Sequence, residues 1–255
     1  DDIINDNNNK ESINKLGQRE CDDQNHDHNE PDPFIHKCRK CPLDPKDEVI
    51  KRGEGCVREY PPNDVGFVFI PDGVTEIPSY YFAECNNMKS ISIAPSVKKI
   101  GSFAFCSALN LESVIFRGTS KLGIIQTGAF MCTSRSVQIG IKSFVLPDST
   151  TYLCQSVFLG AHIHSVTTGA SLKFIDNYAF IYSNVKVIEF NSEYVEVGNS
   201  ALQEVWFLNY SGLHISTKPN RYVFGRGLKS DMTTFKCLND KCRCLPGYGN
   251  ELQNS

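Results

Sequence analysis

Histidine and cysteine side chains that could hold a metal ion gather before residue 42. His26, His28 and His36 precede the pair Cys38 and Cys41, which has the Cys-x-x-Cys spacing that can clamp zinc. The histidines are irregularly spaced in a polar stretch, "HDHNEPDPFIH". We therefore keep zinc as an alternative and expect no metal site and no other cofactor.

The 11 cysteines fall into two groups. Toward the ends we expect disulfide-bonded caps of a secreted domain, formed by Cys38, Cys41, Cys56, Cys237, Cys242 and Cys244. Inside the chain lie Cys85, Cys106, Cys132 and Cys154. For this second group we favour buried thiols that pack as small apolar side chains over Cys85–Cys106 or Cys106–Cys132 bridges. The odd total leaves at least one thiol free or paired outside the chain.

Residue patterns for catalysis are missing from the sequence. It contains no Gly-x-Ser-x-Gly elbow, phosphate-binding loop, His-Glu-x-x-His or Gly-x-Gly-x-x-Gly motif. His162 and His164 flank Ile163 in an alternating run, and we expect two solvated histidines there. The sequence therefore predicts a protein that is not an enzyme.

Composition excludes two further classes. The net charge is −3, so no basic surplus attracts nucleic acid, and no apolar run is long enough to span a membrane. Residues 1–37 carry ten Asp/Glu against four Lys/Arg and are rich in Asn, which predicts a disordered acidic segment. The chain opens without Met, as a processed product would.

A nine-residue pattern recurs as "VTEIPSYYF", "VKKIGSFAF" and "LKFIDNYAF". Its last position belongs to a series of apolar anchors with steps of 23, 25, 28, 22 and 22 residues: Phe82, Phe105, Phe130, Phe158, Phe180 and Leu202. Before each anchor lies a short alternating run, namely "VGFVFI", "MKSISI", "LESVIF", "IKSFVL", "IHSVTT" and "VKVIEF". Such runs are typical of strands with one buried face. Coils of about 22 residues bury an apolar side only by stacking, so we predict a repeat solenoid.

The stretch "MKSISIAPSVKKIGSFAFCSA" resembles the BspA-type leucine-rich repeats of microbial surface proteins, as does "VFIPDGVTEIPSYYFAEC". The resemblance covers about residues 61–211. It implies a leucine-rich repeat stack of about six coils, with a parallel sheet on the concave face and turns or short helical pieces on the convex face. We place a Cys-rich N-terminal cap at 38–60 and a C-terminal linker with a Cys-rich fragment at 212–255. "CLNDKCRCLPGYGNE" resembles the end of an EGF-like module, and "CRKCP" resembles receptor ectodomain repeats.

The resemblance implies an extracellular or cell-surface adhesion or protein-interaction module whose partner is a protein or glycan. A structural spacer in a larger surface protein is the alternative, and an enzyme inhibitor or enzyme is a weaker one. Alternation assigns the possible binding face to Phe67, Phe69, Ser90, Ser92, Ser113, Ile115, Arg117, Ser143, Val145, Ser165, Thr167, Val187 and Glu189. The sequon Asn209-Tyr210-Ser211 makes Asn209 a possible glycosylation site.

Overall fold

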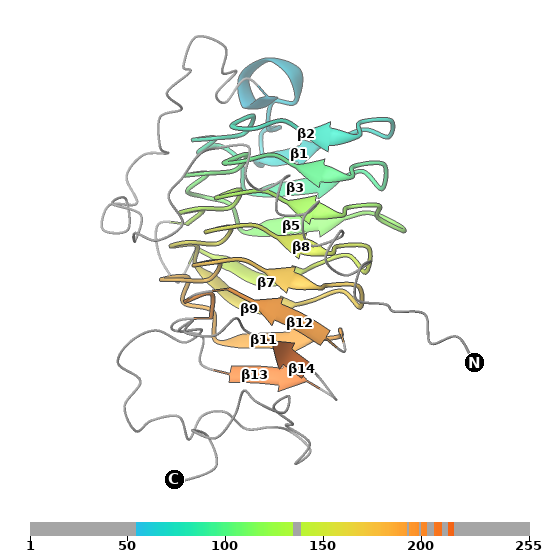
Figure 1. Ribbon diagram of the computed structural model, residues 1–255. Helices are drawn as coiled ribbons and strands as arrows, with labels where there is room; N and C mark the ends of the chain where they lie inside the picture. The colour runs from blue at the N-terminus through green and yellow to red at the C-terminus, as the bar shows by residue number, and fades with distance from the viewer. Residues whose placement is uncertain are drawn as a thin grey trace, which may run out of the picture. The chain divides into compact units, whose positions relative to one another are not determined.

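The computed structural model describes residues 55–134, 139–192, 194–198, 200–202, 207–210 and 214–216. In this part the chain winds into a stack of coils, and successive coils add strands to two parallel sheet faces (Figure 1). The predicted repeat solenoid is confirmed.

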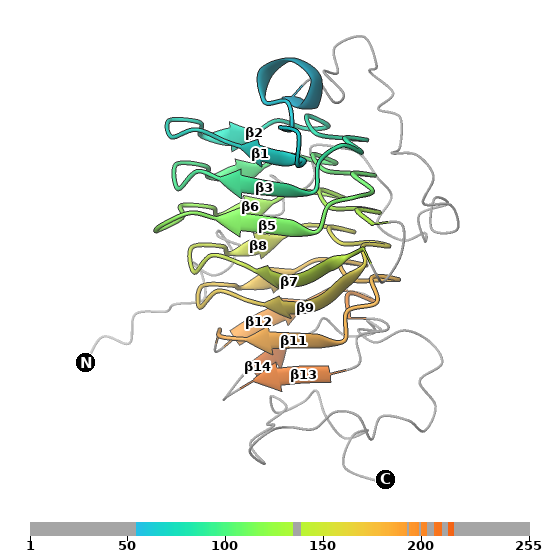
Figure 2. The ribbon, with the colours of Figure 1, turned by 180° about the vertical axis from the view of Figure 1, so that it is seen from behind.

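The odd-numbered strands form the first sheet face, which the alternating runs predicted. They are β1 (Phe67–Phe69), β3 (Ser90–Ile93), β5 (Ser113–Phe116), β7 (Ile141–Val145), β9 (Ile163–Thr167), β11 (Val187–Phe190) and β13 (Phe207–Tyr210). Hydrogen-bonded pairing runs β1-β3-β5 and β7-β9-β11-β13, so the ladder is interrupted between β5 and β7 (Figure 2). An insertion precedes β7: eleven residues separate Phe130 from Ile141, where six separate Phe105 from Leu111.

The even-numbered strands form a second sheet face that the sequence did not predict. They are β2 (Glu76–Ile77), β4 (Lys99–Ile100), β6 (Ile124–Ile125), β8 (Tyr152–Leu153), β10 (Phe174–Ile175), β12 (Tyr194–Val197) and β14 (His214–Ser216). They pair in parallel as one seven-stranded sheet. Most of them have only two residues, which is too short for an alternating pattern to appear in the sequence.

Turns close each coil after its even-numbered strand, as expected for the convex side. Each turn has two residues with left-handed backbone, four positions apart, such as Tyr80 (φ 59°) with Glu84 (φ 61°) and Phe103 (φ 56°) with Ser107 (φ 54°). This conformation costs a non-glycine residue about 1 kcal/mol. Hydrogen bonds between successive turns oppose that cost, for example from the Phe82 amide to the Ala104 carbonyl at 2.8 Å. No short helical piece replaces these turns in the coils that the structure describes.

The anchoring phenylalanines form a continuous stack of rings through the core. Successive ring centroids from Phe82 to Phe180 lie 5.4, 4.8, 5.6 and 5.1 Å apart, and the interplanar angles do not exceed 22°. These rings and Leu202 are all fully buried. The spacing of the rings follows the separation of adjacent strands, because each coil contributes one ring. The predicted core positions are therefore confirmed.

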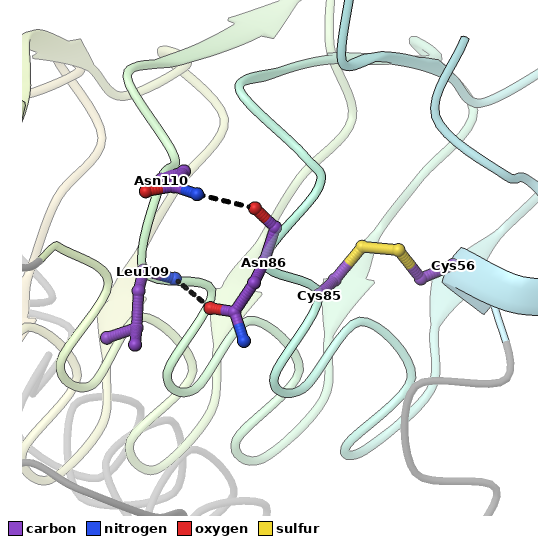
Figure 3. The surroundings of a disulfide bond; sticks show 5 residues. All are labelled: Cys56, Cys85, Asn86, Leu109 and Asn110. Atoms are coloured by element: carbon purple, nitrogen blue, oxygen red, sulfur yellow. Dashed lines mark hydrogen bonds between the residues drawn. A yellow bond between two sulfur atoms is a disulfide. The ribbon is translucent and has the colours of Figure 1, made fainter. Parts of the chain in front are cut away.

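A short π-helix, η1 (Gly55–Glu59), caps the first coil. The Cys56–Cys85 disulfide joins η1 to the end of the first turn (Figure 3). The Gly55 amide donates to the Tyr81 carbonyl at 3.1 Å, and the Tyr81 hydroxyl donates to Oε2 of Glu59. The cap therefore attaches on the turn side of the stack.

Asparagine side chains link the first two coils beside this disulfide. Oδ1 of Asn86 accepts from the Leu109 amide at 3.2 Å, and Nδ2 of Asn110 donates to the Asn86 carbonyl at 2.7 Å (Figure 3). Backbone groups at this corner are thereby satisfied where no strand pairs them.

Candidate binding face

The outward side chains of the first sheet face line up in two columns. Strand register places Phe67 beside Ser90 and Ser90 beside Ser113, and it places Phe69 beside Ser92 and Ser92 beside Ile115. Beyond the interruption, register aligns Ser143, Ser165 and Val187 in one column and Val145, Thr167 and Glu189 in the other. The structure therefore brings the sequence-predicted positions onto one face.

The second column carries large apolar side chains in contact with water. Phe69 is 49%, Ile115 47% and Val145 55% exposed. The inward neighbours Val68, Val114 and Phe144 are buried, as the alternation requires. Exposed aromatic and aliphatic side chains on a rigid sheet are a common feature of protein-binding surfaces. Polar side chains of Ser, Thr and Glu lie beside them in both columns.

Arg117 reaches across this face from the end of β5 to β1. Its Cζ lies 4.2 Å from the centre of the Phe69 ring. Nη2 donates to the Ile70 carbonyl at 2.6 Å and lies 3.2 Å from Oδ1 of Asp72. These contacts bring together residues that are 45 and 47 positions apart in sequence. Alternation placed Arg117 at the strand end, but it gave no sign that the side chain would span two coils.

Ser92 does not take part in the exposed surface. It is only 4% exposed, although alternation predicted an outward, accessible residue. Ser92 lies between Phe69 and Ile115 in the register, and the Arg117 side chain crosses from β5 to β1 over this strand. Small side chains between larger neighbours are readily covered, which explains the difference.

At the other end of the second column the face becomes acidic. Thr167 Oγ1 donates to Oε2 of Glu189 at 3.4 Å, and Glu189 is exposed. In the first column the Ser165 hydroxyl donates to the Lys142 carbonyl at 3.1 Å. The second column therefore runs from a guanidinium over Phe69, through apolar Ile115 and Val145, to a carboxylate.

The two histidines at β9 differ in environment. His164 is exposed in β9, whereas Nδ1 of His162 lies 2.8 Å from Nδ2 of Asn184. Burial lowers the pKa of His162 from its ordinary value of 6.5. The expected pair of equivalent solvated histidines is therefore wrong for His162.

The cysteines inside the repeats are mostly cross-linked, contrary to the expectation of buried thiols. Cys85 pairs with Cys56, and Cys132 and Cys154 are disulfide-bonded as well. Cys106 is a buried thiol whose Sγ lies 3.9 Å from Oγ of Ser107. The expectation was wrong for Cys85, Cys132 and Cys154, because sequence spacing does not show which side of a coil a cysteine faces.

Several predicted features fall outside the described residues: the acidic segment 1–37, the zinc alternative at His26, His28, His36, Cys38 and Cys41, and the C-terminal cysteines Cys237, Cys242 and Cys244. Asn209 lies in β13, opposite Glu189 in the register. Where the structure describes the chain, no group of three or more His, Cys, Asp or Glu side chains is placed to hold a metal ion. Over the same residues, no helix has the length and apolarity needed to cross a bilayer.

Comparison with known families places the repeats. The family model described as "BspA type Leucine rich repeat region" matches six copies, over residues 63–184 and 136–224. The match continues past residue 211, where the sequence alone placed the end of the repeats. It does not extend to the Cys-rich ends, so their likeness to EGF modules has no support from this comparison.

Solved structures with leucine-rich repeats are also similar to the chain. A T. pallidum leucine-rich repeat protein shares 22% identity over 55% of this chain and 76% of its own, with a TM-score of 0.40. A leucine-rich repeat protein from Eubacterium ventriosum shares 16% identity over 62% of each chain, with a TM-score of 0.33. The pneumococcal vaccine antigen PcpA shares 14% identity over 62% of this chain and 69% of its own, with a TM-score of 0.24. No curated protein sequence matches the chain.

Proposed function

Since the chain belongs to the BspA-type leucine-rich repeat family, a family of protein-interaction or surface modules, we propose that it is a non-catalytic adhesion or recognition module of the cell surface or extracellular space. Its partner is a protein that docks on the first sheet face. The observation that carries this proposal is the column of exposed apolar side chains at Phe69, Ile115 and Val145.

The chemistry of the column indicates the kind of surface that fits it. The column is apolar at its centre and has few charges, so it suits an apolar ridge of a protein better than an anionic polymer. The Arg117 guanidinium is already engaged by Asp72 and Phe69, so it holds the shape of the face more than it recruits a charged ligand. A partner with a basic group beside its apolar ridge would meet the exposed carboxylate of Glu189.

Substitutions on the face test the proposal directly. The experiment immobilises purified extracellular-matrix proteins and a glycan array and measures binding of the wild-type chain and of an Ile115→Lys/Val145→Lys variant. Loss of two half-buried anchors at an interface removes about 1.5–3 kcal/mol per side chain, which corresponds to at least a tenfold weaker Kd. Circular dichroism checks that the variant is folded.

The matched control is Val57→Lys, since Val57 is 77% exposed and lies in the cap, away from the sheet face. We expect protein binding that Val57→Lys leaves intact and that the double variant loses. Protein binding that both variants retain would rule out this face. Binding to glycans alone would favour a glycan receptor, and no binding in either format would favour a structural spacer.

A further inference from the structure

A second apolar cluster lies on the outer side of the turns, apart from the core. It consists of Tyr80, Ala83, Phe103, Cys106, Met131, Cys132, Leu159, Tyr178 and Ile181, here called the turn cluster. Within one turn, Phe103 and Cys106 belong to the turn cluster, whereas Ala104 and Phe105 belong to the core. The cluster therefore occupies the opposite side of the coil backbone from the core.

The turn cluster is covered. Its members are at most 7% exposed. On the first sheet face, side chains with similar neighbours above and below but no cover are 47–55% exposed. Every described strand belongs to one of the two sheet faces, so none of these strands supplies the cover. A stripe one side chain deep stays this dry only when further polypeptide lies on it.

Disulfides connect this side of the stack to another part of the chain. Cys132 belongs to the turn cluster, and Cys154 lies just before the next turn and is fully buried. Both are disulfide-bonded. Among the described cysteines only Cys56 and Cys85 are joined to each other, so the partners of Cys132 and Cys154 belong to residues outside the described part.

We propose that residues 32–54 run along the outer side of the turns as a strap, held there by disulfides from Cys38 or Cys41 to Cys132 or Cys154. The chain enters the cap at Gly55, whose amide bonds the Tyr81 carbonyl in the first turn. The segment immediately before Gly55 therefore begins next to Tyr80 and Ala83, the first members of the turn cluster. By contrast, the chain after β14 leaves from the second sheet face.

The strap has the composition and length that this position requires. It supplies five apolar side chains, at Phe34, Ile35, Leu43, Val49 and Ile50. Seventeen positions separate Cys38 from Gly55, a reach of up to roughly 50 Å when extended. Two or three coils span only about 10–15 Å at the usual strand separation. Each bond forms when two thiols give two protons and two electrons to a disulfide oxidant such as oxidised glutathione, which leaves as two thiols.

Peptide mapping of the full chain tests the linkage. Free thiols are alkylated, and the unreduced protein is cut after lysine with endoproteinase Lys-C. The digest separates Cys38 ("CRK"), Cys41 ("CPLDPK"), Cys237 ("CLNDK") and the Cys242/Cys244 peptide, and it places Cys132 and Cys154 in different fragments. We expect "CRK" or "CPLDPK" cross-linked to fragment 122–142 or 143–173. Bonds from Cys132 and Cys154 to Cys21 or the C-terminal cysteines alone would overturn the proposal.

Exposure of the turn cluster gives a second readout. The variant Cys38→Ser/Cys41→Ser releases the strap, and we expect severalfold higher fluorescence of the apolar dye ANS at unchanged circular dichroism. The matched control is Cys237→Ser/Cys242→Ser/Cys244→Ser, which leaves the strap cysteines in place and should not raise the fluorescence. If only the C-terminal variant raises dye binding, the C-terminal segment is the cover and the proposal fails. Binding through Ile115 and Val145 should survive in both variants, so this test does not depend on the proposed function.

Discussion

Single residues adapt the repeat where neighbouring coils come close. Gly128 has left-handed backbone (φ 60°) at a position where other coils have Tyr80, Phe103, Ser156 and Tyr178. Backbone conformation alone therefore does not require glycine at this point. A Cβ on Gly128 would lie 2.3 Å from the Phe103 ring, however. The ring stacks against Tyr80 on its other neighbour, with centroids 5.1 Å apart, so it has little room to move.

Replacing Gly128 by alanine should therefore lower the free energy of unfolding by more than the usual conformational cost. We expect about 2–4 kcal/mol, the sum of roughly 1 kcal/mol of backbone strain and an overpacking term. Urea unfolding measures it. The control is Gly73→Ala, where φ is also positive but no atom lies within 4 Å of the new Cβ. Equal losses in both variants would show that the ring contact is unimportant.

His162 gives the fold a pH dependence. Burial lowers its pKa below 6.5 in the folded chain, so between these two values the unfolded chain binds more protons than the folded one. Stability is therefore full above pH 6.5, falls as the pH drops toward the folded pKa, and levels off below it. We expect His162→Gln to lose part of the decrease in unfolding free energy between about pH 7.5 and pH 5. His164→Gln, which changes an exposed neighbour, should keep it, and equal profiles would contradict the assignment.

The elements of the repeat were predictable to the extent that their patterns are longer than one period. Alternating runs located the strands of the first face, and the recurring Phe located the stacked rings. The two-residue strands of the second face left no such signal. The Arg117–Phe69 contact and the Cys56–Cys85 bond join different coils or a coil and the cap, and such pairings depend on how the coils stack. Side-chain exposure at Ser92 depended on that same long-range contact.

The cap should depend strongly on its disulfide. Cys56 and Cys85 are 29 residues apart, and cross-linking a loop of this length restricts the unfolded chain by about 3–4 kcal/mol. A Cys56→Ser/Cys85→Ser variant should lose a comparable amount of stability, with the first coil exchanging its amide protons first. Hydrogen exchange followed by mass spectrometry measures this. Uniform loss of protection along all coils would show that the cap closes the whole stack instead of its first coil.

At the scale of the whole stack, the two faces differ in continuity. The second sheet face is an uninterrupted ladder of seven described strands, whereas the first is broken between β5 and β7. Across the break the Phe116 and Phe144 rings meet edge to face at 6.0 Å. Ring contact therefore replaces part of the missing ladder.

Amides that face the break should exchange faster than those inside either half of the first face. We expect lower protection in β5 and β7 than in β3 and β9, since some of their backbone donors lack a strand partner across the break. Residue-resolved hydrogen exchange checks this prediction. Equal protection in the four strands would mean that the break closes in solution.

The stacked rings also make the repeat a unit of length. Each anchor follows the previous one by one strand spacing, and the segments that differ in length between anchors bulge outward without changing that step. Duplicating the 22 residues from one anchor to the next would lengthen the molecule by about 4.8 Å. The same operation would shift every later side chain of the binding face by one row. A set of such duplications would turn the chain into a graduated ruler for the distance at which its partner is held.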